Sequence, residues 1–394
     1  MRCILISFFN SDNIGDVIIA NTLYEFMKNI CNTEKISYSS EPFVYTDINK
    51  MYIRNKANIK NLVKIILYRI IIICNIEKII DYYREYHKSE NINKIEEKIV
   101  ESDIVVIGGG NMIFDATKFS RSASGFKKII DIAKNHNKKV FVISIGIGPF
   151  VTQIQEKQAV EVLNRCDFIT FRDSKSLEIY RKYYNDKNFF LTIDPVFMLP
   201  CYVSNDNNKK EHIIGINLFD NRLAKVKQKK KYNEVKKGYV ELINMLLKNT
   251  GLKIVLFSTA LNDYKVIEDV YKKISTSNVE VRRISGFDDL IKLYNEIDLL
   301  IGCRMHSMII AYTQYIPVIG LSWQPKVDAF FDIINQPKYV FRYDRIHDNL
   351  KQILDCCVLK LNNLKHEKEK IQSKLKEIRT NFKINEDIMS KLIK

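Results

Sequence analysis

Several familiar sequence patterns are missing from this chain of 394 residues, and each absence excludes a class of protein. Its eight cysteines include no C-x-x-C pair and have no metal-ligand spacing, so we expect no metal site. The sequence has no zinc-finger spacing, aromatic-rich RNA-binding signature or helix-turn-helix pattern, so we expect no nucleic-acid partner. The most apolar run, residues 65–74, contains Arg69 and is too short to span a membrane.

Charge and cysteine content indicate a compartment but do not identify a partner. The formal net charge of +16 attracts polyanions, acidic membrane surfaces and anionic substrates alike. The cysteines lie mostly in or beside apolar segments and are typical of small core residues in a reducing compartment. We expect no cleavable signal peptide, because the chain enters an apolar strand at Cys3. A cytoplasmic protein is expected, and peripheral association with the inner face of the plasma membrane stays open.

The sequence repeats one pattern, in which a β-branched run is followed by a Gly- or Asn-rich turn and then by a helical segment. This repetition predicts the fold class. The predicted strands are residues 3–8, 104–107, 140–145, 168–171, 189–192, 213–218, 253–257, 279–283, 297–301 and 317–321. The predicted helices include residues 17–29, 123–135, 154–164, 174–183 and 307–314. This alternation is typical of an α/β protein with parallel sheets covered on both faces. Ligands of such sheets bind beyond the carboxyl ends of the strands.

The polar stretch at residues 195–210 is the best candidate for a linker between two domains. We predict an N-terminal Rossmann-like domain at residues 1–200, a C-terminal Rossmann-like domain at 211–345 and a helical tail at 346–394. The two domains are expected to face each other across a cleft. A mostly helical insertion at about residues 59–101 is expected either to pack on the first domain or to lie on a membrane surface.

Two further segments leave alternatives open. Residues 225–237 contain seven lysines and form either a solvated loop or a mobile basic flap over an anionic ligand. In the tail, Leu364, Ile371 and Ile378 recur at seven-residue intervals and predict one amphipathic helix over residues 361–394. This helix is expected to pack back on the N-terminal domain or to form a coiled-coil dimer.

The turn after the strand at residues 297–301 is the leading candidate for a ligand site. Arg304 and His306 follow Gly302 at the predicted start of a helix, where backbone N–H groups lack partners and the helix dipole is positive. Such a turn is suited to hold a phosphate or carboxylate. Ser307 begins the predicted helix, Lys326 follows the next strand, and both join the candidate binding set.

Two glycine-rich turns end neighbouring strands of the N-terminal half and are expected to form a ligand floor. Gly109 and Gly110, followed by Asn111, permit backbone torsions and close contacts that other residues do not allow. Gly146 and Gly148 form the second such turn. The first of these turns does not have the G-x-G-x-x-G spacing of a dinucleotide site, and no acidic residue follows at the required distance.

Three polar residues stand at other strand exits. Asp16 lies in an NIGD turn after the first strand, where it or Asn13 can cap free helix N–H groups. Arg172 ends the strand at residues 168–171 and can grip a carboxylate or phosphate with its planar fork. Asp173, which follows it, is placed to cap the next helix.

The order of these motifs resembles that of the polysaccharide pyruvyl transferase family. The motifs are NIGD at residues 13–16, GGGN at 108–111, SIGIGP at 144–149, FRDSKS at 171–176, DP at 194–195, GCRMHS at 302–307 and the segment 317–326. They span about residues 1–330. The insertion, the lysine run and the tail carry none of them. Cys303 is a departure, since a small or apolar residue fits equally well there.

This resemblance implies two Rossmann-like domains in the GT-B arrangement and a transferase that needs no cofactor. It implies transfer from phosphoenolpyruvate, a co-substrate, to a sugar diol, which gives a cyclic pyruvate ketal and phosphate. It assigns proton donation to His306 and donor binding to Arg172 and Lys326, with Arg304 as a third cation. Asp16 or Asp173 is the candidate for orienting or deprotonating the acceptor. The acceptor is a sugar of a cell-surface polysaccharide or of its precursor, which can be lipid-linked.

Two other functions remain open at this stage. A GT-B glycosyltransferase using a nucleotide sugar would need an acidic residue at a C-terminal-domain helix to bind the ribose hydroxyls, where this chain offers Arg304, His306 and Lys326. A non-catalytic glycan- or membrane-binding module would explain the positive charge. It gives no reason for His306 and the arginines to occur together.

Overall fold

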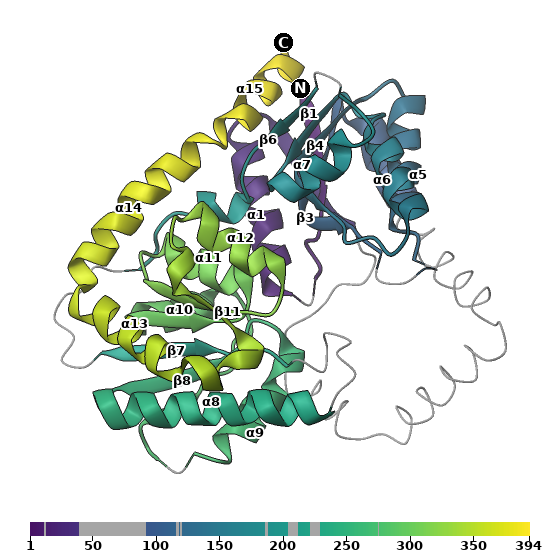
Figure 1. The fold of residues 1–394 in the computed structure, drawn as a ribbon. Coiled ribbons are helices and arrows are strands. Elements are labelled where there is room, and N and C mark those ends of the chain that lie inside the picture. The colour runs from purple at the N-terminus through teal and green to yellow at the C-terminus, as the bar shows by residue number, and fades with distance from the viewer. Residues whose placement is uncertain are drawn as a thin grey trace. The chain divides into compact units, whose positions relative to one another are not determined.

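The computed structural model describes residues 1–11, 13–38, 92–115, 118, 120–185, 188–203, 212–220, 229–274 and 276–394. The chain divides into two compact units, each built on a parallel sheet (Figure 1). Unit 1 comprises Met1–Ser11, Ile19–Asp194 and Ile384–Lys394, and unit 2 comprises Asp12–Ile18 and Pro195–Lys383. The predicted α/β class with two Rossmann-like domains is therefore confirmed. Most of the predicted insertion, part of the predicted linker and the start of the lysine run lie outside the described residues.

Within the described residues, the sheet of unit 1 has six parallel strands in the order β2-β1-β3-β4-β5-β6. They are β1 (Arg2–Ser7), β2 (Asn32–Ser37), β3 (Ile104–Ile113), β4 (Lys139–Ile147), β5 (Phe168–Phe171) and β6 (Phe189–Leu191). The five strands predicted for this half are confirmed. The sequence did not predict β2, because an edge strand with the sequence NTEKIS lacks an apolar run.

Helices cover this sheet and bury one apolar core. They are α1 (Ile14–Lys28), a helix at residues 92–101, α5 (Ser122–Asn135), α6 (Gln153–Leu163), α7 (Ser174–Arg181) and α15 (Lys383–Ile393). Alternate strand residues, such as Ile4, Val105 and Val142, pack against α5 and α6 in this core. Alternation of this kind follows from the two-residue repeat of a strand.

Unit 2 has a second parallel sheet, with six described strands in the order β12-β11-β10-β7-β8-β9. They are β7 (Ile213–Asn217), β8 (Lys253–Phe257), β9 (Val279–Val281), β10 (Leu299–Gly302), β11 (Val318–Ser322) and β12 (Val340–Arg342). Counted from β7, this is the 3-2-1-4-5-6 order of Rossmann folds. The five predicted strands are confirmed. The short edge strand β12 was not predicted.

The helices of unit 2 flank its sheet. They are α8 (Lys229–Thr250), α9 (Tyr264–Tyr271), α10 (Phe287–Glu296), α11 (Met305–Thr313), α12 (Pro325–Ile333), α13 (Leu350–Asn362) and α14 (Leu364–Thr380). Short 3-10 helices are η2 (Pro195–Met198), η4 (Leu261–Asp263), η5 (Pro337–Tyr339), η6 (Tyr343–Arg345) and η7 (His347–Asn349). Within the described residues, no helix is both long and apolar enough to cross a membrane.

The lysine run is not a loop from residue 229 onward. Residues 229–237 form the first turns of α8, so both loop interpretations are wrong for this part of the run. Tyr232, Val235 and Tyr239 are buried at helical spacing in the core of unit 2. This apolar stripe explains why a lysine-rich segment is helical.

The tail is three helices rather than the one predicted. α13 ends at Asn362, and α14 is followed by a break before α15 begins at Lys383. Ile371 and Ile378 of α14 are buried, as their seven-residue spacing predicts. α13 and α14 belong to unit 2, whereas Ile384–Lys394 belong to unit 1. The expectation that the tail packs back on the N-terminal domain is therefore confirmed for α15.

Candidate functional site

The turn between β10 and α11 lies at the topological switch of unit 2, between β7 and β10. Connections leave these two strands in opposite directions, and ligands of open α/β sheets bind beyond the carboxyl ends at such a point. Asn217, the last residue of β7, accepts the Arg304 N–H on its side-chain Oδ1 at 2.9 Å. Its carbonyl oxygen accepts the Cys303 N–H at 3.2 Å. The neighbouring strand therefore fixes this turn.

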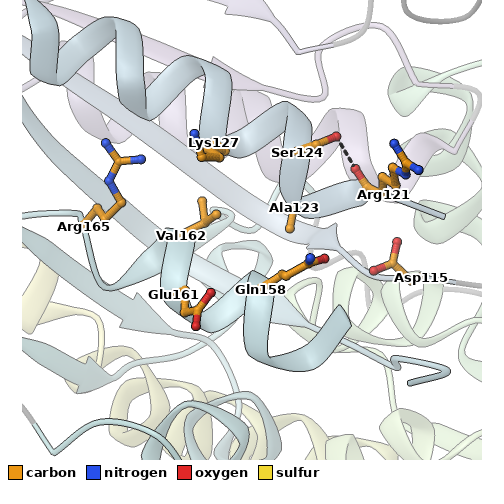
Figure 2. Close-up of a pocket in the computed structure, with 9 residues that line it drawn as sticks. All are labelled: Asp115, Arg121, Ala123, Ser124, Lys127, Gln158, Glu161, Val162 and Arg165. Carbon is orange, nitrogen blue, oxygen red and sulfur yellow. Dashed lines mark hydrogen bonds between the residues drawn. The ribbon is translucent and has the colours of Figure 1, made fainter. Parts of the chain in front are cut away.

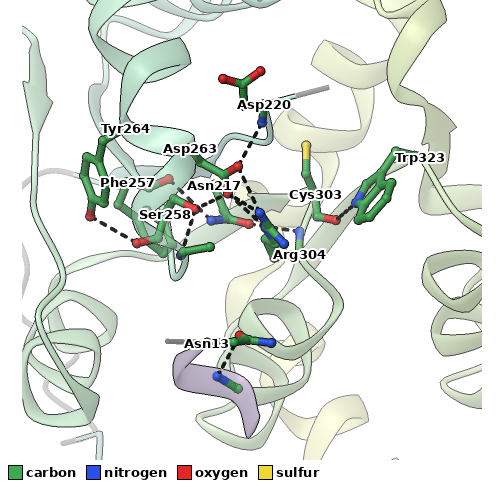
Figure 3. A network of polar contacts seen from close by, with 12 residues as sticks. Asn13, Asn217, Asp220, Phe257, Ser258, Asp263, Tyr264, Cys303, Arg304 and Trp323 are labelled. Carbon is green, nitrogen blue, oxygen red and sulfur yellow. Dashed lines mark hydrogen bonds and ion pairs between the residues drawn. The ribbon is translucent and has the colours of Figure 1, made fainter. Parts of the chain in front are cut away.

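A buried carboxylate holds the side chain of Arg304 (Figure 3). The Nε and Nη2 groups of Arg304 each donate to Asp263 at 2.9 Å. Asp263 is fully buried and also accepts from Ser258 Oγ at 2.7 Å and from the Asp220 N–H at 3.0 Å. Burial raises the pKa of Asp263, although Arg304 and the hydrogen bonds oppose that rise. Within the described residues no carboxylate contacts Nη1 of Arg304, so this edge of the fork is suited to an anion.

Aromatic rings support the same arginine. The guanidinium carbon lies 4.9 Å from the centroid of the Phe219 ring, and Trp323 stacks on that ring with centroids 3.9 Å apart. Trp323 Nε1 donates to the Cys303 carbonyl at 3.0 Å. Burial raises the pKa of Cys303 to about 12, so its thiol stays protonated near neutral pH and is no nucleophile. Cys303 thus fills a buried position in the turn.

His306 lies against the NIGD turn, and both belong to unit 2. A Cβ atom built on Gly15 would lie 2.3 Å from His306 Nδ1 and 2.8 Å from its Cβ, so only glycine leaves room for the imidazole. Asn13 Oδ1 accepts the Gly15 N–H at 3.1 Å, and Asn13 Nδ2 donates to Asp16 at 3.1 Å. The predicted cap is therefore formed by Asn13. Two motifs far apart in sequence meet at the candidate proton donor.

The other two unit 2 candidates differ in accessibility. Ser307 is fully buried, and Tyr294 of α10 contacts its hydroxyl at 2.9 Å and its carbonyl at 2.7 Å. We therefore leave Ser307 out of the ligand-binding set, because its polar groups serve helix packing. Lys326 is exposed near the start of α12, where helix N–H groups and a cation favour an anion.

The two glycine-rich segments of unit 1 are joined to each other. Gly109, Gly110 and Asn111 lie within β3 and Gly146 lies within β4, so these residues extend the strands and do not form the strand-exit turns that the sequence predicted. Gly109 and Gly110 have φ of 78° and 82°, in the left-handed region that favours glycine. A Cβ on Gly109 would lie 2.4 Å from Ile19 of α1, so this glycine permits close packing of a helix. Asn111 Nδ2 donates to the Gly148 carbonyl at 2.7 Å. Asn111 therefore fixes one glycine-rich segment to the other.

Arg172 is buried beside Gly146, near the end of β4. Its Nη1 donates to Asp194 at 2.8 Å, and its side chain is 7% exposed. A Cβ on Gly146 would lie 2.8 Å from Arg172 Nε, so this glycine makes room for the guanidinium. Asp173 caps α7 as predicted and accepts the Ser176 N–H at 2.8 Å. The SIGIGP, FRDSKS and DP motifs thus form one contact group.

Sequence reasoning missed the residues that hold the two arginines. Asp263 is 41 positions from Arg304, and Asn217 is 87 positions away, so neither spacing forms a local pattern. Asp194 belongs to a quoted motif, but its ion pair with Arg172 was not predicted. The only sequence signal for Asn217 and Asp263 was that they lie at or after the ends of β7 and β8, because strand ends of one parallel sheet meet at one edge.

A separate pocket of about 620 Å³ lies between α5 and α6 of unit 1 (Figure 2). Its lining residues are Asp115, Arg121, Ala123, Ser124, Lys127, Gln158, Glu161, Val162 and Arg165. None of the candidate residues named above lines it. Asp131 pairs with both Lys127 and Arg165, so its single negative charge balances one of these two positive charges within the protein.

Several solved structures have a fold similar to that of this chain. Alr3699/HepE of Anabaena in complex with UDP is 9% identical over 99% of this chain and 100% of its own, with a TM-score of 0.58. The S. aureus MnaA–UDP structure is 12% identical over 94% and 91%, with a TM-score of 0.55. A glycosyltransferase of Rickettsia africae ESF-5 is 13% identical over 100% and 98%, with a TM-score of 0.52. These likenesses support the GT-B-like fold class alone.

Sequence comparison assigns the family. No curated protein matches the chain in sequence. The sequence profile described as polysaccharide pyruvyl transferase matches residues 13–325, from the NIGD turn to the start of α12. Because this match covers well over half of the chain, the protein belongs to the polysaccharide pyruvyl transferase family.

Proposed function

We propose that this transferase uses phosphoenolpyruvate as donor and forms a pyruvate ketal on a sugar of a cell-surface polysaccharide or its precursor. The family supports modification of a polysaccharide. The observation that carries the finer proposal is the His306–Gly15 contact at the turn of the anchored Arg304. At that turn, the imidazole of His306 can carry a proton and the Nη1 edge of Arg304 can bind an anion. The turn follows the carboxyl end of a strand, which is where ligands of such sheets bind.

The charge of the donor supports this choice. Phosphoenolpyruvate carries about three negative charges near neutral pH and calls for several fixed cations. In unit 2, Arg304 offers its Nη1 edge while Asp263 holds the rest of its fork, and Lys326 adds a cation at the start of α12. In unit 1, Arg172 matches a position at which the family holds the donor, and Asp194 fixes its orientation.

The proposed reaction assigns each proton. His306 protonates the methylene carbon of the donor, which becomes the methyl group, while a sugar hydroxyl attacks the neighbouring carbon. The bond from that carbon to the phosphate oxygen then breaks, and a second hydroxyl closes the ring. The two hydroxyls release two protons, of which one restores His306 and the other leaves with phosphate. Asp16 is proposed to orient or accept a proton from the sugar.

A nucleotide-sugar glycosyltransferase is the second candidate, because two of the similar structures contain UDP. Such a glycosyltransferase needs a carboxylate that binds the ribose hydroxyls. Asp263 is an unsuitable one, since it is fully buried and bound to Arg304. The cations of unit 2 fit a small multianion better.

The test is release of inorganic phosphate from phosphoenolpyruvate over a broad panel of free and lipid-linked sugar acceptors. We expect phosphate release that depends on one class of acceptor, with a pyruvate ketal on the product. Silence over the whole panel, with no donor binding by calorimetry, would contradict the proposal. Turnover of a UDP-sugar without any response to phosphoenolpyruvate would favour the second candidate. Activity of lipid-linked acceptors alone would place the reaction at a membrane surface.

A further inference from the structure

A cluster of buried polar side chains in unit 1 is centred on Asn385 of α15. Its amide oxygen accepts from Thr170 Oγ1 at 2.7 Å. Its amide nitrogen donates to Thr192 Oγ1 at 3.0 Å and, more weakly, to Ser144 Oγ at 3.4 Å. All four residues are at most 4% exposed. A buried amide with both ends satisfied links the C-terminal helix to three neighbouring segments of the sheet.

The three hydroxyl residues have a common spacing relative to the Arg172 group. Each lies two positions before a member of that group: Ser144 before Gly146, Thr170 before Arg172 and Thr192 before Asp194. Each hydroxyl residue is therefore separated from a member of that group by a single residue along the chain. Asn385 therefore ties together the three segments that bring Arg172, its ion-pair partner and its glycine neighbour into contact.

One of these segments has a local irregularity. β4 pairs Val142 with Ile169 but then Ile145 with Phe171, so three steps on β4 oppose two on β5. Ser144 within this bulge has φ of 47°, an unusual value for a residue other than glycine. Its N–H donates to Thr170 Oγ1 at 2.8 Å. Bulges redirect the residues that follow them, so the cluster that holds Ser144 also determines where Gly146 meets Arg172.

We propose that Asn385 is a positioning residue, which acts through the Ser144–Thr170–Thr192 hydroxyls to hold Arg172 in its binding geometry. The effect on the donor rests on the proposed function, in which Arg172 binds phosphoenolpyruvate. Asn385 lies far beyond residues 13–325, the part that matches the family profile, so the family resemblance assigns it no role. An asparagine supplies one acceptor and two donors to three hydroxyls, which a leucine of similar size cannot do.

The test compares two full-length variants that both alter the buried face of α15. Asn385→Leu removes the hydrogen bonds, whereas Ile388→Val trims a side chain that is 1% exposed and leaves them intact. We expect hydrogen exchange at residues 140–147 and 168–172 to be faster by about tenfold only in Asn385→Leu, which corresponds to loss of about one hydrogen bond. We also expect its KM for phosphoenolpyruvate to rise by about tenfold while kcat changes less.

Equal exchange in the two variants would overturn the proposal. So would faster exchange with unchanged KM and kcat, because the cluster would then be structural only. A wild-type protein that does not use phosphoenolpyruvate contradicts the proposed function instead. In that case a crystal structure of Asn385→Leu decides the question: an Arg172–Asp194 contact retained at 2.8 Å overturns the positioning role, and a displaced guanidinium supports it.

Discussion

At the scale of single residues, two glycines are important because they have no side chain. Gly15 leaves room for the ring of His306, and Gly146 leaves room for the guanidinium of Arg172. In each case a Cβ would approach the functional side chain to within 2.8 Å or less, closer than atoms in contact can lie. These glycines therefore define where the imidazole of His306 and the guanidinium of Arg172 lie. The glycine-rich motifs also suggest that these segments contact a ligand, and that is a separate prediction.

The first prediction concerns Gly15→Ala. The added methyl group meets the base of the imidazole, including its Cβ, so the whole side chain of His306 has to move. A displacement near 1 Å at a catalytic group costs about 100-fold in rate. We expect kcat for phosphate release to fall by about that factor, with donor affinity changed much less.

Gly286→Ala is the matched control, because a Cβ at Gly286 meets no atom within 4 Å and its φ of −170° suits any residue. We expect this variant to keep wild-type kcat. Equal activity of the two variants would show that the Gly15 contact does not position His306.

Site residues were predictable from the sequence where the residues beside them form a local pattern. Arg304 and His306 were found because a strand, a glycine and a helix start are adjacent in sequence. Asp263, which holds Arg304, was missed because a single aspartate 41 positions away carries no signal of its own. Ser307 was placed in the binding set from its position alone, whereas its burial against Tyr294 depends on packing that no spacing reveals.

At the scale of elements, buried strands and exposed edges differ in how well the sequence predicts them. Central strands such as β7 and β10 carry continuous apolar runs, which the sequence reveals directly. β2 and β12 lie at sheet edges, where one side of the strand is unpaired and polar residues are tolerated. The tail was predicted as one helix because its seven-residue repeat, which lies wholly within α14, was extended to the segments on either side.

A buried ion pair joins α13 to α14, and the second prediction concerns this pair. Lys360 Nζ lies 2.7 Å from Glu367 and 3.8 Å from the centroid of the Tyr339 ring. Burial alone would raise the pKa of Glu367, but the hydrogen bond and charge of Lys360, with the charge of Lys370, outweigh it and hold the pKa below its ordinary 4.5. The ionised Glu367 carboxylate therefore contributes stability above about pH 4.5.

Glu367→Gln leaves the Lys360 ammonium buried without a counter-charge. We expect the free energy of unfolding to fall by about 3 kcal/mol at pH 7. Because the wild-type carboxylate loses its stabilising effect as pH falls through its depressed pKa, the gap between wild type and variant should close in acid. Denaturant unfolding at a series of pH values measures this gap. Exposed Glu369→Gln is the control, and parallel pH curves for Glu367→Gln and wild type would contradict the assignment.

At the scale of the whole molecule, fold and family were both predictable from sequence, for different reasons. The fold class follows from the alternation of apolar strands and helices. The family follows from seven short motifs in a fixed order, which the match over residues 13–325 confirms. The tail was less predictable, because α13 and α14 belong to unit 2 while Ile384–Lys394 belong to unit 1. That division depends on contacts such as those of Asn385, which a helical pattern does not encode.

In the proposed mechanism, His306 donates the proton that starts ketal formation. The most direct measurement compares wild type and His306→Ala for phosphate release from phosphoenolpyruvate and for donor binding by calorimetry. We predict a fall in kcat of about 10²- to 10⁴-fold with donor affinity retained. Trp323 is the sole tryptophan of the chain and stacks on the ring beneath Arg304, so its fluorescence checks that the turn stays folded. Unchanged kcat in a folded His306→Ala protein would contradict the account.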